Sequence, residues 1–154
     1  MKYISTLLAV SDLEKSRQFY REILGMEVTA DFGANVVLDD RIALQTKETW
    51  AEFIRTGDIA FRHNAGELYF EETDMDAFLE RLGQFEIRYV HPLMTHRWGQ
   101  RVVRFYDPDG HIIEVGEDLG TVVRRFRDSG MTAEQIAQRM DVPLPYVLER
   151  TEGN

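Results

Sequence analysis

The sequence predicts an α+β fold made of two β-α-β-β-β modules, followed by a short C-terminal helical appendage. A strand pattern, a Ser/Thr-Asp pair and an amphipathic helix pattern occur in this order twice, starting near residues 3 and 67. After residue 117 the strand patterns stop and helical periodicity remains. We therefore expect a domain over residues 1–117, with modules 1–58 and 59–117, and a helical tail over 118–154.

The first module opens with a β-rich apolar run over residues 3–10. Ser11 and Asp12 then form a helix start signal, and Gly25 is placed to end the helix in the left-handed conformation. The strand patterns that follow cover residues 26–32, 35–38 and 41–46. Residues 47–58 are ambiguous, although Trp50, Phe53 and Ile54 could form the apolar face of a short helix.

The second module repeats this order with a strand at residues 67–72, a cap at Thr73-Asp74 and a helix closed by Gly83. The further strand patterns cover residues 87–90, 100–106 and 111–115. The Asp-Pro-Asp-Gly stretch at 107–110 is a strong turn signal. The loop expected before the second of these strands contains His91, Pro92, His96, Arg97 and Trp98.

The tail predicts two or three short helices, with Gly130 as a stop and Thr132 as a cap. Residues 131–143 resemble the first half of a helix-turn-helix. The segment that would follow as a recognition helix offers Arg150 as its one basic residue, beside Glu149. Nucleic-acid contact needs more donors than this, so the tail favours a helical hairpin that packs on the domain or on a dimer mate.

Composition excludes several classes of function. The formal net charge is −9, which argues against broad binding to nucleic acid or to anionic membranes. The chain contains no cysteine, so disulfides, thiolate chemistry and Cys-based zinc sites are excluded. The apolar run at the N-terminus is too short to span a membrane. These features predict a cytoplasmic protein.

Two stretches resemble the vicinal-oxygen-chelate superfamily, which includes glyoxalases, bleomycin-resistance proteins and dioxygenases. They are VSDLEKSRQFY at 10–20 and VRFYDPDGHIIEV at 103–115, and the strand-cap-helix pattern at 67–82 adds to them. The resemblance covers about residues 1–117. It implies paired β-α-β-β-β modules, sheets curled around a cleft that holds a ligand or a metal, and a homodimer.

The resemblance also implies four metal-ligand positions, one on the first strand and one on the last strand of each module. Glu67 and Glu114 stand at these positions in module two, whereas Ser5 and Leu44 stand at those of module one. A register slip would replace Leu44 with Gln45. Two carboxylates and two non-ligands make a weak site for Zn, Mn, Mg, Ni or Fe, unless a loop histidine such as His91, His96 or His63 assists.

We therefore expect Glu67 and Glu114 to be polar groups of a ligand pocket, paired with Arg104 or Arg101. Further candidates for ligand contact are the planar and cationic side chains of Trp50, His96, Arg97, Trp98 and Arg104. His111, by contrast, is expected at the surface or at a strand end.

The first hypothesis for function is binding of a small planar or anionic compound without a tight catalytic metal. The second is a metal-dependent lyase, isomerase or dioxygenase with Glu114 as general base or metal ligand. The third is a regulatory module that senses a ligand and binds a partner through its tail.

Overall fold

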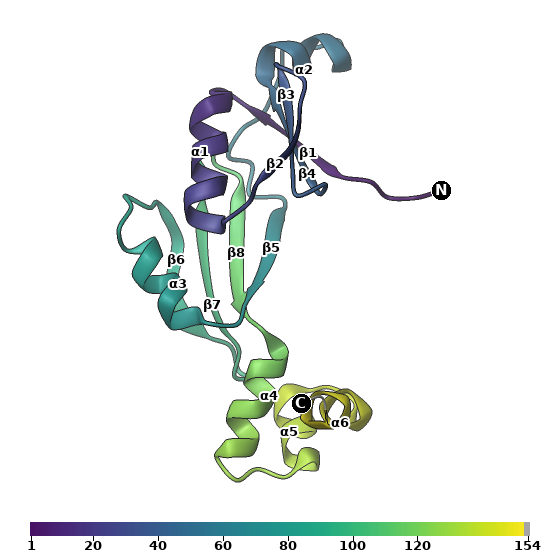
Figure 1. Ribbon diagram of the computed structural model, residues 1–154, viewed down its shortest axis with the longest axis vertical. Helices are drawn as coiled ribbons and strands as arrows, with labels where there is room; N and C mark the ends of the chain where they lie inside the picture. Colours follow the sequence, from purple (N-terminus) through teal and green to yellow (C-terminus); the bar gives the residue numbers. More distant parts are fainter. Residues whose placement is uncertain (153–154) are drawn as a thin grey trace. The chain divides into compact units, whose positions relative to one another are not determined.

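The computed structural model describes residues 1–152, which form two compact units. The first unit comprises residues 1–66 together with 106–111, and the second comprises the remainder of the described chain. Each unit contains one four-stranded sheet, and the two sheets have the same strand order (Figure 1). This confirms the predicted α+β fold with a duplicated arrangement.

The first unit contains β1 (Thr6–Val10), α1 (Leu13–Leu24), β2 (Val28–Asp31), β3 (Asn35–Leu38), β4 (Ile42–Thr46) and α2 (Lys47–Ile54). Its sheet runs in the order β1-β4-β3-β2, with β1 parallel to β4 and the other pairs antiparallel. Asp12 caps α1 by accepting a hydrogen bond from the N–H of Lys15, and Gly25 ends the helix with a φ of 70°. The segment 47–58, which was ambiguous from sequence, forms the helix α2 over Lys47–Ile54. This agrees with the helical alternative that placed Trp50 on an apolar face.

The two faces of the first sheet are covered differently. Leu8, Leu44 and Val36 are register partners and share one face, where Leu44 and Val36 are at most 1 % exposed. Buried Tyr20 and Ile23 of α1 add to this core. Leu7 and its partner residues point to the opposite face, because side chains alternate along a strand.

The second unit contains β5 (Glu67–Glu72), α3 (Met75–Leu82), β6 (Tyr89–Thr95), β7 (Arg101–Tyr106, its last residue belonging to the first unit), β8 (Ile112–Glu117), α4 (Leu119–Asp128), α5 (Ala133–Met140) and α6 (Leu144–Glu152). Its sheet runs β5-β8-β7-β6, with β5 parallel to β8. Asp74 caps α3 as Asp12 caps α1. The internal repeat expected from the sequence is therefore present.

Strand β6 is longer than the sequence predicts and includes His91 and Pro92. The expectation that both lie in a loop is wrong. β6 is an edge strand of its sheet, where a proline can sit because its missing N–H need not serve a neighbour. The pairing with β7 shifts register between His91 and Met94, which marks the irregularity around Pro92.

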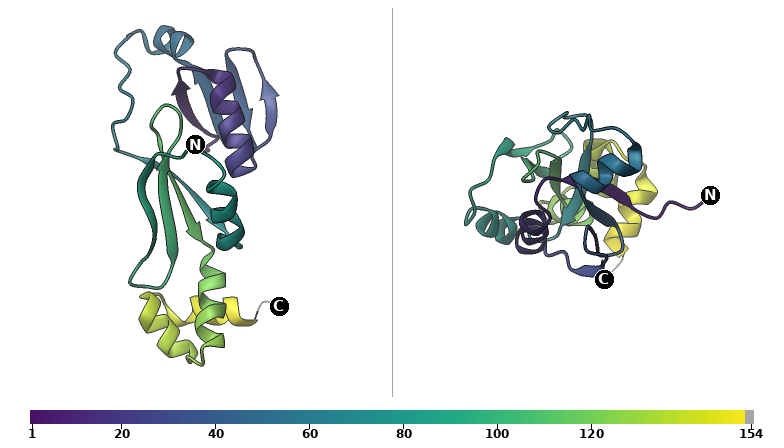
Figure 2. Two further views of the ribbon diagram at one scale, coloured as in Figure 1. Left: turned by 90° about the vertical axis from the view of Figure 1, so that its left-hand side faces the viewer. Right: turned by 90° about the horizontal axis from the view of Figure 1, so that it is seen from above.

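The three tail helices lie side by side (Figure 2) and build a core of their own. Its fully buried members are Val122, Val123, Ile136 and Val147, and Trp98 packs against it from outside the tail. Thr132 and Gln135 form a reciprocal capping box at the start of α5, so the predicted cap is confirmed. The three helices bury one another's apolar faces, and this packing stabilises helices that would be too short to persist alone.

A buried carboxylate joins this tail to the second sheet. Glu117, at the end of β8, has a side chain only 1 % exposed. Arg101 reaches it at 3.1 Å and Arg125 of α4 reaches it at 2.8 Å. Arg125 also donates a hydrogen bond to the carbonyl oxygen of Gly99. Sequence inspection did not single out Glu117, since its partners lie 16 and 8 residues away.

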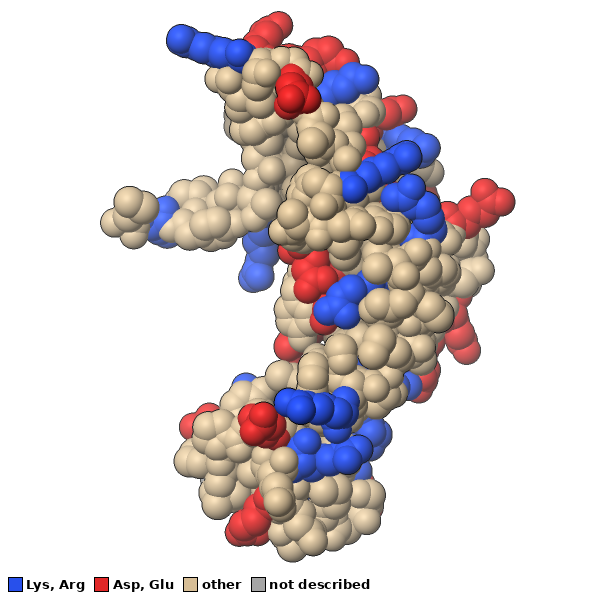
Figure 3. All heavy atoms as spheres, turned by 180° about the vertical axis from the view of Figure 1, so that it is seen from behind, with Lys and Arg blue, Asp and Glu red and all other residues tan. Residues whose placement is uncertain are grey.

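Both signs of charge occur on the face drawn in Figure 3, where acidic and basic side chains are present on each unit. Within residues 1–152, no helix is both long and apolar enough to cross a membrane.

Neutralising Glu117 should weaken the second unit. We expect Glu117→Gln to lower the free energy of unfolding by about 2 kcal/mol, because charged hydrogen bonds from two guanidinium groups are lost in a buried place. Urea denaturation followed by circular dichroism measures this loss. Glu149→Gln, at an exposed position of α6, is the matched control and should leave stability unchanged. Equal stability of both variants would contradict the anchoring role.

Candidate functional site

A row of polar side chains crosses the face of the second sheet that α3 leaves open. Phe105 of β7 contacts Phe78 of α3, with ring centroids 6.4 Å apart. The neighbouring Arg104 therefore points to the opposite face, because successive side chains alternate. The β5–β8 register brings Glu67 and Glu114 to this same face.

Arg104 lies at the centre of this row and contacts three side chains. Its Nε donates to Glu67 at 2.8 Å, one terminal nitrogen pairs with Glu114, and the other faces Nε2 of His91 at 3.2 Å. The expected ion pairs with Arg104 thus form. Arg101, the other arginine considered for them, pairs instead with Asp76 and Glu117.

Burial makes this cluster an ionic arrangement rather than a surface pair. The Glu114 side chain is 8 % exposed and the Arg104 side chain 24 %, whereas Glu67 is 37 % exposed. Attraction between opposite charges strengthens as water is excluded, and a buried carboxylate needs such a partner to remain ionised. The most deeply buried member, Glu114, depends most on Arg104.

The equivalent first-strand position in the first module holds no charge. Asp12 and Asp74 cap the two helices in the same way, and counting back from them matches Ser5 to Glu67. Ser5 precedes β1. Its neutral hydroxyl is a poor ligand for a divalent ion.

The equivalent last-strand position is Ala43, and the expectation that Leu44 fills it is wrong by one residue. Leu7 pairs with Ala43 in the first sheet as Tyr69 pairs with Glu114 in the second. A slip of one residue turns a strand side chain to the other face, and Leu44 accordingly lies in the buried core. Neither residue offers a donor atom.

The residues at these positions do not fit a tightly held divalent metal. Gln45, the alternative donor, is committed to Asn35 and Thr49. Both carboxylates of the second module are already bound to the cationic Arg104. Across residues 1–152, no group of three or more His, Asp or Glu side chains is arranged to hold a metal ion.

The remaining predicted residues of the second unit lie near the tail. Trp98 packs against the tail core and stacks on His96 with ring centroids 4.1 Å apart. Burial, with the charge of Arg104, lowers the pKa of His96. Arg97 pairs with Asp141 at 3.9 Å between two exposed side chains. Arg97 and Trp98, together with α5 and Asp141, border a shallow cavity of about 350 Å³.

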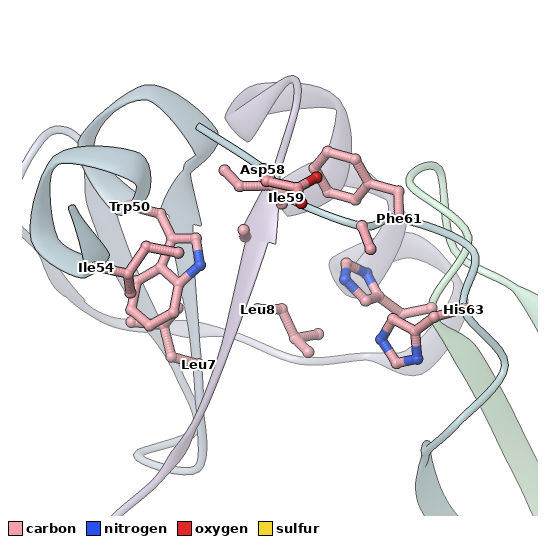
Figure 4. Close-up of a pocket in the computed structure, with 11 residues that line it drawn as sticks. Leu7, Leu8, Trp50, Ile54, Asp58, Ile59, Phe61 and His63 are labelled. Carbon is pink, nitrogen blue, oxygen red and sulfur yellow. The ribbon is translucent and has the colours of Figure 1, made fainter. Parts of the chain in front are cut away.

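Trp50 lies elsewhere, in a cavity on the open face of the first sheet (Figure 4). The cavity has a volume of about 260 Å³. Its walls come from β1, α2, the segment after α2 and the turn before β8. The lining residues are Leu7, Leu8, Ala9, Trp50, Ile54, Asp58, Ile59, Ala60, Phe61, His63 and His111. The structure therefore separates the predicted site residues into three places.

The sequence analysis did not place His63 or His111 at this cavity, since it considered His63 only as an assisting metal ligand. His111 was expected at the surface or at a strand end. It does precede β8, but its side chain is only 14 % exposed and its Nδ1 lies 2.8 Å from Asp107. The spacing of four residues between Asp107 and His111 across a glycine turn was the available signal. His63 carries no comparable signal, because only the tertiary fold brings it to the cavity.

Comparison with known proteins agrees with this architecture. The sequence model of the glyoxalase-like domain matches residues 3–120. A solved protein of unknown function from Agrobacterium tumefaciens str. C58 is 36 % identical, with a TM-score of 0.68 over 77 % of this chain and 94 % of that one. The family match ends near the start of α4, so most of the tail lies outside it.

Two curated relatives cover the same region. Protein YraH of Bacillus subtilis (strain 168) is 27 % identical over 75 % of this chain and 97 % of its own length. Metallothiol transferase FosB of Lysinibacillus sphaericus (strain C3-41) is 25 % identical over 70 % of this chain and 76 % of its own length. Together with the duplicated sheets, the match over residues 3–120 shows that this chain belongs to the glyoxalase-like domain family.

Proposed function

We propose that this chain binds a small organic compound in the cavity of its first unit and works without a tightly held catalytic metal. The ion pairs of Arg104 support the absence of a tightly held metal. Its guanidinium group occupies the centre of the polar row and is bound by the two carboxylates at the metal-ligand positions. The guanidinium group of Arg104 thus neutralises the two carboxylates, as a bound metal ion would otherwise do.

The cavity supports the binding of a small organic compound. Its volume of about 260 Å³ lies just below the usual range for ligand pockets and suits a compact molecule. Trp50 and Phe61 offer flat apolar walls, and the few polar groups are His63, His111 and Asp58. Apolar walls with a small number of polar groups are typical of sites for organic ligands.

The metal-dependent enzyme is the second candidate, and the similarity to a metallothiol transferase favours it. It requires Glu114 to leave Arg104 and bind a metal. The ion pair at a side chain only 8 % exposed opposes this exchange. The homodimer, the cytoplasmic location and the partner-binding tail remain predictions.

Metal analysis separates the two candidates. Protein purified without chelators should contain far less than one transition-metal ion per chain by plasma mass spectrometry. Arg104→Leu removes the competing cation and should bind Mn²⁺ at least about tenfold more tightly than the wild type, because two carboxylates become available. Titration calorimetry measures this gain.

The matched control is Arg139→Leu, at an exposed position of α5, which should leave Mn²⁺ binding unchanged. One tightly held metal ion per wild-type chain that disappears in Glu114→Ala would sink the metal-independent proposal.

Ligand binding at the cavity can be followed by fluorescence. The chain contains two tryptophans, so Trp98→Phe leaves Trp50 as the sole reporter. We expect 2-indanone, a planar ketone small enough for the cavity, to quench Trp50 emission with saturation. Ala60→Leu fills part of the cavity and should weaken this binding about tenfold or more, since added side-chain volume displaces the ligand.

Ala77→Leu, at an exposed position of α3, is the control for this substitution and should bind as the parent does. Quenching that is linear in ketone concentration, or equal in all three proteins, would mean that the cavity is not the binding site.

A further inference from the structure

We propose that Asp107 and His111 form an acid–base pair that serves this cavity, with Nε2 of His111 accepting a proton from a carbonyl compound and His63 donating a hydrogen bond to its oxygen. The proposal rests on the proposed ligand site in the first unit and adds a reaction class to it, namely removal of a proton next to a carbonyl group. All residues that carry it belong to the first unit.

Asp107 is held rigidly. Its side chain is fully buried. One carboxylate oxygen accepts hydrogen bonds from the backbone N–H groups of Asp109, Gly110 and His111 at 2.8–3.0 Å. The other accepts from the hydroxyl of Tyr20 at 3.1 Å. A carboxylate fixed by so many donors holds its partner imidazole in one orientation.

The contact with Asp107 determines which nitrogen of His111 is available. Nδ1 lies 2.8 Å from the carboxylate and therefore carries a proton. Nε2 of the neutral ring is then a proton acceptor, and within the described residues it has no hydrogen-bond partner. His111 lines the cavity, and its ring makes a T-shaped contact with Phe61, with centroids 6.2 Å apart. A base oriented by a buried carboxylate is the arrangement that general base catalysis uses.

His63 is in the opposite tautomer, so its Nε2 is a donor where that of His111 is an acceptor. Its Nδ1 accepts a hydrogen bond from the backbone N–H of Ala65 at 3.0 Å. An accepting Nδ1 leaves the proton on Nε2, which becomes a donor. The cavity is thus lined by one imidazole with an acceptor nitrogen and one with a donor nitrogen. This pair is complementary to a carbonyl oxygen beside an acidic C–H bond.

The segment that carries His63 is kept against the turn by a close contact. Gly110 has a φ of 91°, and a side chain at this position would meet Cγ of Arg62 at 2.3 Å. The absence of a side chain therefore lets Arg62 lie over the turn. The hydroxyl of Tyr106 also donates to Asn64 at 3.0 Å. These two contacts bring His63 and His111 to one cavity from distant parts of the chain.

Proton transfer in this site is balanced without a further reactant. The C–H bond next to the carbonyl breaks, its proton moves to Nε2 of His111, and the electron pair forms the enolate. The hydrogen bond from His63 stabilises the oxygen of the enolate, and Asp107 stabilises the imidazolium. Return of a proton from Nε2 restores the ketone. In D₂O the proton that returns is a deuteron, so the cycle replaces hydrogen with deuterium.

The pH dependence follows from the groups around His111, which are Asp107, Asp109, Tyr20, His63, Asp58 and Arg62. Burial acts to lower the pKa of His111, but the hydrogen bond and charge of Asp107 and the charge of Asp109 raise it above 6.5. Activity as a base should therefore rise with pH and level off above that pKa. Loss of the Asp107 charge should move the midpoint to lower pH.

Deuterium exchange of the benzylic protons of 2-indanone, followed by proton NMR, tests the proposal. The full chain should accelerate exchange about 100-fold over the same concentration of free imidazole. His111→Gln should lose this acceleration, and Trp50 quenching measured on the same variant distinguishes loss of the base from loss of the bound ketone. Asp107→Asn should lower the midpoint of the pH profile, and NMR titration of the His111 ring should show the same lowering without any ligand.

The outcomes are separable. Saturable Trp50 quenching without accelerated exchange, or exchange that persists in His111→Gln, would overturn the acid–base pair and leave the ligand site standing. Absence of quenching in the parent chain would remove the ligand site itself. An unchanged His111 titration in a folded Asp107→Asn chain would show that the carboxylate does not act on the ring.

Discussion

The buried carboxylate of Asp107 organises one end of the first unit. It closes the turn before β8 through three backbone hydrogen bonds and contacts α1 through the hydroxyl of Tyr20. Because burial without partners would cost a carboxylate several kcal/mol, these contacts act together. They place His111 at the cavity. The hydrogen bonds of Asp107 that close this turn therefore also orient His111, the side chain that we propose as the general base.

The duplicated sheets have acquired different chemistry on their open faces. The first sheet presents Leu7 and Ala43 where the second presents Tyr69 and Glu114, and a cavity with both apolar and polar walls forms on the first. The second has an ionic row centred on Arg104. A common backbone thus carries a cavity in one unit and a closed set of charges in the other. This division places Trp50 in the first unit and the other predicted site residues in the second.

Much of the fold was predictable because its signals are local. Asp12 and Asp74 cap helices that their sequence neighbourhood predicts, and Gly25 ends the first as a glycine at that position should. The pairing of Glu114 with Arg104 was also predicted, since both stand in strands of one hairpin. Local signals therefore sufficed where the partners are near in sequence or fixed by a strand pattern.

The site was predicted less well, because its parts depend on register and on long-range packing. The predicted alignment of the last strand was one residue off, so it named Leu44 in place of Ala43. In a strand, a slip of one residue turns every side chain to the other face of the sheet. His91 and Pro92 were expected in a loop but lie in β6. Proline is tolerated there because an edge strand does not need its missing N–H for pairing. The partners of Glu117 and the approach of His63 to His111 exist only in the folded chain, so no window of sequence contains them.

Each unit carries one of the two tryptophans, Trp50 beside the cavity and Trp98 against the tail core. The intrinsic emission of this protein is therefore a sum of two independent local signals. Chains that retain one indole each would reveal whether the halves melt in a single cooperative transition or in two successive ones. The placement of these side chains gives the molecule built-in probes of its own cooperativity.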